Sequence, residues 1–228
     1  MFKEIKLMSD KKKNTVLFYP YISKNASKLI VNRLKTRWVG QGPVVDKFEK
    51  LFEKLFLNKA KCISTGSGTD ALHLAYILAD IKKGDEVIVP VFTCTATNIP
   101  LLYMGAKIKF ADINPTTMNI SIESIKKLIS KKTKAIVCVH YGGNCCEMDE
   151  ISKIAKKYNA KVIEDAAQAI GAEYNKVKIG NISDFTAFSF QAIKHITTGD
   201  GGMLVMKNTK LIEKAKRLRW FGIDRKKK

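Results

Sequence analysis

The sequence predicts an α/β protein with a mainly parallel, seven-stranded sheet flanked by helices. Short apolar runs of strand length alternate along the chain with segments whose apolar residues recur at helical spacing, which is typical of β-α-β units. The chain has 228 residues, of which 46% are hydrophobic and 27% charged. This balance indicates a globular chain with a large core and excludes a disordered or fibrous one.

Seven segments are expected to be strands because each is a short apolar run bounded by turn residues or by a helical segment. They cover residues 62–63, 86–89, 107–110, 135–139, 161–163, 185–190 and 203–206. Pro90 closes the second of these strands, because proline cannot donate a hydrogen bond to a neighbouring strand. A glycine-rich loop, residues 199–202, precedes the last strand.

The helices are expected where apolar residues lie three and four positions apart. They cover residues 22–34, about 45–56, 69–78, a run that ends at 104, a segment capped by Ser121, 148–158 and about 210–220. Gly105 is a natural helix stop, and residues 38–43 read as a turn. We expect a tail over residues 1–20, one large domain over 21–222 and a basic tail over 223–228.

The sequence argues against a membrane-spanning protein and against a secreted one. The most apolar stretch, residues 87–106, contains Pro90, Pro100 and several threonines, so no segment is expected to span a bilayer. The charged N-terminal residues lack the apolar core of a secretory signal, which predicts a cytoplasmic protein. The five cysteines are odd in number and two of them are adjacent, so reduced thiols are expected rather than disulfides.

The net charge of +20 comes from 41 basic and 21 acidic residues. All but five of the basic residues are lysines, and they are scattered through the helical segments. Nucleic-acid surfaces usually use arginine and cluster their charge. We therefore expect solvated helix faces and no nucleic-acid partner, while an anionic partner remains the alternative. A phosphorylated or nucleotide-linked small molecule would suit this positive field.

Chemistry-bearing residues follow three of the predicted strands, and the ligands of open α/β sheets bind at the carboxyl ends of strands. The first group is Gly66-Ser67-Gly68-Thr69-Asp70, which opens a helix. Glycines let the backbone approach an anion, and the free N–H groups of a helix N-terminus point at it. The sequence lacks the Gly-Lys-Ser/Thr of a P-loop. An ordinary strand–helix turn with a capping side chain is the alternative.

The second group is Glu164-Asp165, with Gln168 three residues further on. A carboxylate at the end of a buried strand needs a partner, because an unpaired buried charge is costly. A cationic ring nitrogen would supply that partner, and Gln168 is close enough in sequence to reach the same ligand. A carboxylate that caps the next helix is the alternative.

The third group is Lys194, which follows the apolar strand 185–190. Desolvation of such a lysine would make it a nucleophile toward an aldehyde. The alternative is an ordinary solvated lysine, since the chain contains many. A phosphate cup, a strand-end acid and a loop lysine are together the requirements of pyridoxal 5'-phosphate (PLP).

These segments resemble the DegT/DnrJ/EryC1/StrS sugar aminotransferases. The similar segments are 67–75 (SGTDALHLA), 87–93 (VIVPVFT), 164–169 (EDAAQA) and 188–202 (FSFQAIKHITTGDGG), preceded by 41–43 (QGP) and 48–49 (FE). The resemblance covers residues 20–222. It implies a PLP-dependent transferase of fold type I whose active site forms between two subunits of a homodimer. The implied reaction moves an amino group from glutamate to a nucleotide-linked 4-keto-6-deoxy sugar, as in perosamine synthases.

The resemblance also implies roles for individual residues. Lys194 would carry the cofactor as a Schiff base and later shuttle a proton. Asp165 would pair with the pyridinium nitrogen, and Gln168 would contact the ring hydroxyl. The phosphate would be held by Ser67, Gly68, Thr69 and Ser189.

Two departures from the family pattern bear on activity. Cys94 occupies the position where many relatives place an aromatic residue on the cofactor ring, so stacking would be thinner, with Phe92 not expected to replace it. The family also continues past this point into a small C-terminal domain, so these 228 residues are expected to be either a fragment or a truncated gene product. We therefore expect the 228 residues alone to bind PLP weakly and to turn over negligibly.

For some residues a structural role is the alternative to a functional one. Cys138, His140, Cys145 and Cys146 lack paired zinc-ligand spacing, so core and loop thiols are expected and no metal. His140 is a candidate for the sugar side of the site, and His195 either contacts substrate or packs. Other functions left open are an inert truncated relative, a PLP-dependent sugar dehydratase and, from composition alone, a nucleic-acid binder.

Overall fold

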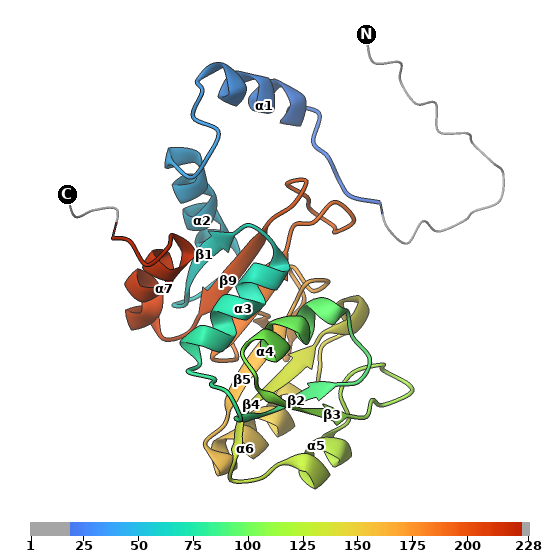
Figure 1. Cartoon of the computed structure of the whole chain (residues 1–228). Coiled ribbons are helices and arrows are strands. Elements are labelled where there is room, and N and C mark those ends of the chain that lie inside the picture. The colour runs from blue at the N-terminus through green and yellow to red at the C-terminus, as the bar shows by residue number, and fades with distance from the viewer. Residues whose placement is uncertain (1–18, 225–228) are drawn as a thin grey trace, which may run out of the picture.

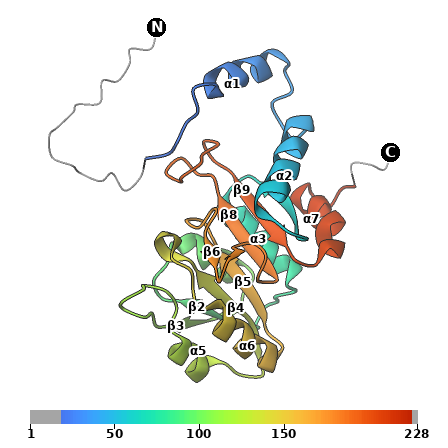
Figure 2. The same ribbon diagram turned by 180° about the vertical axis from the view of Figure 1, so that it is seen from behind.

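The computed structural model describes residues 19–224, and its centre is one seven-stranded sheet (Figures 1 and 2). The strands lie in the order β1-β9-β8-β5-β4-β2-β3. Their bounds are β1 Lys61–Thr65, β2 Glu86–Pro90, β3 Lys107–Ala111, β4 Thr133–Val139, β5 Lys161–Asp165, β8 Phe185–Ser189 and β9 Gly202–Met206. β9 runs antiparallel to both neighbours, and the other adjacent pairs are parallel. The predicted fold class is confirmed.

Helices cover both faces of the sheet. They are α1 Ala26–Lys35, α2 Pro43–Phe56, α3 Gly68–Leu78, α4 Ile99–Tyr103, α5 Ile122–Leu128, α6 Met148–Tyr158 and α7 Ile212–Arg219. Single 3₁₀ turns are η1 Thr95–Thr97, η2 Tyr141–Gly143 and η3 Thr209–Leu211, and a small hairpin pairs β6 Glu173–Tyr174 with β7 Val177–Lys178. The expected helix before residue 104 is shorter than predicted, since a 3₁₀ turn replaces its first part. None of the described helices is long and apolar enough to cross a bilayer.

The two faces of the sheet have separate cores. Side chains of α3, α4 and α7 pack with Ile63, Val137 and Ile163 on one face. On the other face, α5 and α6 cover one end of the sheet, and α2 covers the other end near β1, β8 and β9. Because successive side chains of a strand point to opposite faces, Ile163 and Asp165 share the α3 face, while Glu164 points to the other.

The N-terminal segment departs from the body of the fold. Figure 1 shows α1 lying apart from the sheet, and this helix has no buried residue. Just before it, Tyr21 forms a parallel bridge with Ile196 in the loop between β8 and β9. Most of the expected tail, residues 1–18, and the end of the basic tail, residues 225–228, lie outside the described residues.

Candidate active site

A cavity of about 320 Å³ lies at the carboxyl ends of β5 and β8, beside the start of α3. Eight residues were assigned to the cofactor from the sequence, and seven of them line this cavity: Ser67, Gly68, Thr69, Cys94, Asp165, Ser189 and Lys194. They come from four separate parts of the chain. The structure thus brings the predicted phosphate loop, acid and lysine to one place, as the sheet-edge rule for α/β folds requires.

The start of α3 forms one wall of the cavity, a cradle of a kind that suits an anion. The Ser67 hydroxyl accepts a 3.0 Å hydrogen bond from the Asp70 amide and caps the helix. The amides of Gly68 and Thr69 lie in the first turn, where an α-helix offers no backbone acceptor. A side chain on Gly68 would place its Cβ 2.9 Å from the Ser189 Cβ. Only glycine therefore lets the helix start lie against the end of β8.

Asp165 also lines the cavity and is only 4% exposed. One carboxylate oxygen accepts from the Thr97 hydroxyl at 2.7 Å and the other from the Ala167 amide at 3.1 Å. Within the part of the chain that the structure describes, no basic side chain forms an ion pair with it. A buried carboxylate with only neutral donors is suited to a cationic ligand.

The surroundings of Asp165 are buried and polar. Tyr76 is fully buried and donates a 2.8 Å hydrogen bond to the carbonyl oxygen of Thr97. Burial raises the pKa of Tyr76 well above its ordinary value, and the nearby Asp165 carboxylate raises it further. The phenol therefore stays protonated and keeps Thr97 in place. Thr97 in turn lies 2.7 Å from the Thr93 hydroxyl, which can satisfy its second hydrogen bond.

Lys194 lies in the loop between β8 and β9, and it also lines a second, adjoining cavity of about 210 Å³. Gln168, the eighth predicted residue, lines that second cavity together with Tyr19, Tyr141 and His195. Its side-chain oxygen accepts a 2.7 Å hydrogen bond from the Gly142 amide. The NH₂ group of Gln168 has no acceptor among the described residues, so it is available to a ligand.

Cys94 occupies the position where many relatives are expected to place an aromatic residue. Cys94 is exposed and borders the larger cavity. Phe92 instead packs against Tyr141, with ring centroids 4.9 Å apart. Phe92 is not among the residues that line either cavity. Thin stacking on the cofactor ring at this position stays a prediction.

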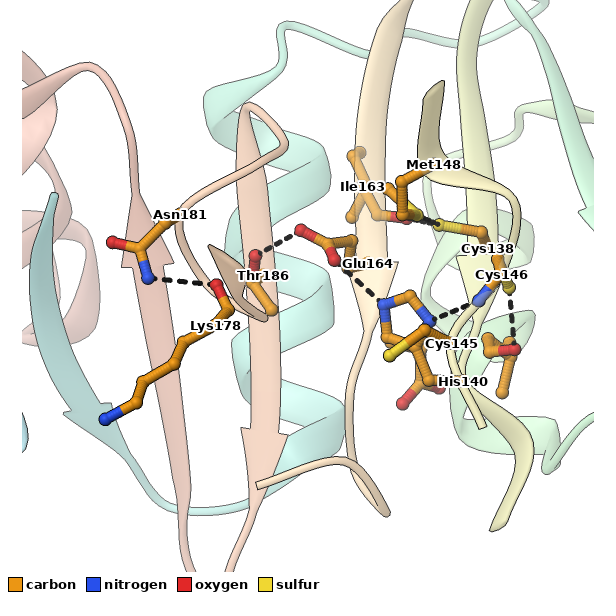
Figure 3. A network of polar contacts seen from close by, with 12 residues as sticks. Cys138, His140, Cys145, Cys146, Met148, Ile163, Glu164, Lys178, Asn181 and Thr186 are labelled. Carbon is orange, nitrogen blue, oxygen red and sulfur yellow. Dashed lines mark hydrogen bonds and ion pairs between the residues drawn. The ribbon is translucent and has the colours of Figure 1, made fainter. Parts of the chain in front are cut away.

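One candidate from the sequence lies outside both cavities. His140 was a candidate for the sugar side of the site, but its side chain is 0% exposed and lines neither cavity. Its Nε2 lies 2.8 Å from a carboxylate oxygen of Glu164 (Figure 3). Glu164 was missed as a functional candidate, although its place next to Asp165 in a buried strand was the available signal. No three His, Cys, Asp or Glu residues in the described ranges are placed to hold a metal.

The comparisons with known proteins agree with this geometry. The sequence model of the DegT/DnrJ/EryC1/StrS aminotransferase family matches residues 20–228. The chain belongs to this family. It is 46% identical over 208 residues to the uncharacterised protein MJ1066 of Methanocaldococcus jannaschii, covering 91% of this chain and 54% of that protein. It is 38% identical to GDP-perosamine synthase of Caulobacter vibrioides, covering 90% and 55%.

Solved structures of sugar enzymes share the fold. PseC of Helicobacter pylori, an aminotransferase of pseudaminic acid biosynthesis, superposes with a TM-score of 0.87 and 31% identity, over 92% of this chain and 57% of that one. GDP-4-keto-6-deoxymannose-3-dehydratase with a trapped PLP-glutamate geminal diamine superposes with a TM-score of 0.87 and 32% identity, over 94% and 57%. The chain therefore spans about half the length of the relatives it matches. Aminotransferases of this family depend on PLP.

Proposed function

We propose that this chain is the cofactor-binding part of a PLP-dependent aminotransferase that acts on a nucleotide-linked 4-keto-6-deoxy sugar, with glutamate as amino donor. The observation that carries the proposal is that an acidic and a basic side chain line the same cavity, and neither forms an ion pair among the described residues. Asp165 is buried with neutral donors only, and Lys194 has no ion-pair partner among the described residues.

The residues of the cavity fit the three parts of PLP. The cradle at Gly68 and Thr69 fits the phosphate, because helix N-termini bind anions and a side chain at Gly68 would fill the space. Ser67 and Ser189 lie beside it. Asp165 fits the pyridinium nitrogen. Lys194 fits the aldehyde carbon, with which a neutral lysine amine reacts.

When bound, PLP supplies an electron sink that stabilises negative charge on the amino-acid carbon. The residues then have separate tasks. Asp165 holds the proton on the ring nitrogen, and Thr97 and the Ala167 amide orient its carboxylate. Lys194 would hold the cofactor and would move a proton at the substrate carbon. Gln168 offers its NH₂ group to the ring hydroxyl, and Gly142 fixes the direction of that amide.

Borohydride reduction of the PLP-loaded protein, followed by peptide mapping, tests the site. We expect the reduced cofactor on Lys194, and label on another lysine would overturn the assignment. Incubation of the chain, fused to the C-terminal region of a close relative, with glutamate and a panel of nucleotide-linked keto-sugars then tests the reaction. An amino-sugar product supports the proposal.

The second candidate is a PLP-dependent sugar dehydratase, because dehydratases are among the structural neighbours. The resemblance favours transamination, since some relatives that dehydrate carry histidine at the position of Lys194. Loss of a sugar hydroxyl without incorporation of nitrogen would identify the dehydratase. We also propose a homodimer that completes the site. Sedimentation of the PLP-loaded protein tests this, and a monomer with full activity would overturn it.

A further inference from the structure

A fully buried polar network lies on the face of the sheet opposite the cavity (Figure 3). Its centre is Glu164 on β5, with 0% exposure. One carboxylate oxygen accepts a 2.8 Å hydrogen bond from the Thr186 hydroxyl on β8. The other oxygen lies 2.8 Å from Nε2 of His140, at the end of β4. Glu164 thus joins the three adjacent strands β4, β5 and β8 through side chains.

The direction of each hydrogen bond follows from the chemistry of the donors. The backbone amide of Cys146 lies 3.1 Å from Nδ1 of His140. An amide can only donate, so Nδ1 carries a lone pair and the ring proton is on Nε2. His140 therefore donates to Glu164, which is the acceptor of two bonds. Such a network is costly to break, because removing one member leaves a buried donor or acceptor without its partner.

Two of these three strand ends, those of β5 and β8, also line the cavity. Asp165 directly follows Glu164, and its carbonyl oxygen accepts a 3.1 Å hydrogen bond from the His140 amide. The Ala166 amide donates to the carbonyl oxygen of Ala187 on β8 at 2.8 Å. Because neighbouring strand residues point to opposite faces, holding Glu164 on one face fixes the direction of Asp165 on the other.

We propose that Glu164 is a positioning residue: with His140 and Thr186 it sets where the Asp165 carboxylate lies in the cavity. It acts through the backbone, since none of these three side chains lines either cavity. Its effect on catalysis rests on the function proposed above, whereas its effect on the position of Asp165 does not. A displacement of about 1 Å at such a group can cost a hundredfold in rate.

Glu164→Gln tests the inference, and Glu86→Gln is the matched control. Glu86 is also a strand carboxylate that accepts two hydrogen bonds, from Ser130 and Lys109. It lies at the amino end of β2, whereas Glu164 lies near the carboxyl end of β5. In the cofactor-free protein, we expect the Ala167 amide, which bonds to Asp165, to exchange its hydrogen about tenfold faster in Glu164→Gln. The control should leave this rate unchanged. Equal exchange rates in the two variants would overturn the inference.

Thr186→Val is the milder second variant, which removes one hydroxyl at nearly constant volume, and it carries the test if Glu164→Gln does not fold. We expect a smaller increase in Ala167 exchange than in Glu164→Gln. In the PLP-loaded protein, the visible absorption band should shift its pH midpoint in both variants and not in Glu86→Gln. A wild-type protein that binds no PLP would overturn the proposed function, while the cofactor-free exchange rates would still decide the role of Glu164.

Discussion

The backbone amide of Tyr21 donates a 3.1 Å hydrogen bond to the carbonyl oxygen of His195, the residue after Lys194. Among the described residues, the other hydrogen bonds of loop 191–200 stay within the loop or reach the adjacent strand ends at Ser189, Phe190 and Gly201. The N-terminal segment therefore restrains the part of the loop that carries the lysine.

Substitution Tyr21→Pro should loosen this loop, because proline has no N–H to donate. Tyr21→Ala is the control, since it keeps the amide and removes a side chain that is 73% exposed. We expect the proline variant to bind PLP about fivefold more weakly, the effect of one lost hydrogen bond of about 1 kcal/mol. Titration of PLP absorbance measures this, together with the rate of proteolysis within 191–200. Identical behaviour of the two variants would show that the bond is dispensable.

Substitution Gly68→Ala should weaken both the fold and the phosphate cradle. Its Cβ would lie 2.9 Å from the Ser189 Cβ, so α3 and β8 would have to separate. Overpacking of this kind costs about 1–3 kcal/mol, and the PLP dissociation constant should rise about tenfold or more. Chemical denaturation and PLP titration measure the two effects. Gly40→Ala serves as control, because nothing lies within 4 Å of its added Cβ.

Substitution Asp165→Asn should keep the fold and remove most of the turnover. The amide is nearly the same size as the carboxylate, but it carries no charge to hold a proton on the ring nitrogen. In the chain fused to the C-terminal region of a close relative, we expect a transamination rate at least about a hundredfold lower, as when a stabilising charge is removed from an active site. Thermal unfolding should stay close to that of the parent chain. Near-normal turnover in this variant would show that the acid is structural.

The stability of the chain should fall in acid, and Glu86 should contribute to that fall. Hydrogen bonds from Lys109 and Ser130 lower the pKa of the Glu86 carboxyl. A carboxyl with a lower pKa in the folded state stabilises the fold above its unfolded pKa and loses that contribution as the pH falls. Glu86→Gln should therefore reduce the loss of stability between about pH 5 and pH 3. Denaturant unfolding across this range measures it, and an unchanged slope would contradict the prediction.

The sequence predicted the sheet well because each strand is a short apolar run whose burial is set locally. It also predicted that Gly68, Asp165 and Lys194 share a site, since strand ends of a parallel sheet meet at one edge. It did not reveal the burial of His140. That burial depends on Cys146, whose amide reaches Nδ1 only after the chain from 141 to 147 folds back, and no spacing rule describes such a return.

The length of the chain relative to its relatives leads to a further prediction. The 228 residues span about half of those proteins, and side chains of α7 and the residues after it are partly exposed, with Leu218 at 37% and Phe221 at 84%. We expect the 228-residue chain by itself to bind PLP weakly and to self-associate. Fusion to the C-terminal region of a close relative should restore binding and turnover. Ordinary enzyme rates from the 228 residues by themselves would contradict this.

The antiparallel direction of β9 has a consequence for engineering. Because Ser189 pairs with Gly202, the loop that carries Lys194 leaves the sheet and returns to it at one rung, as a hairpin does. A parallel neighbour would need a crossover helix instead. We therefore expect residues 191–200 to be exchangeable as a unit, whereas Phe190 before them packs in the core. Such a loop can be lengthened, shortened or transplanted between homologues to move the reactive amine, while the pairing of the seven strands stays the same.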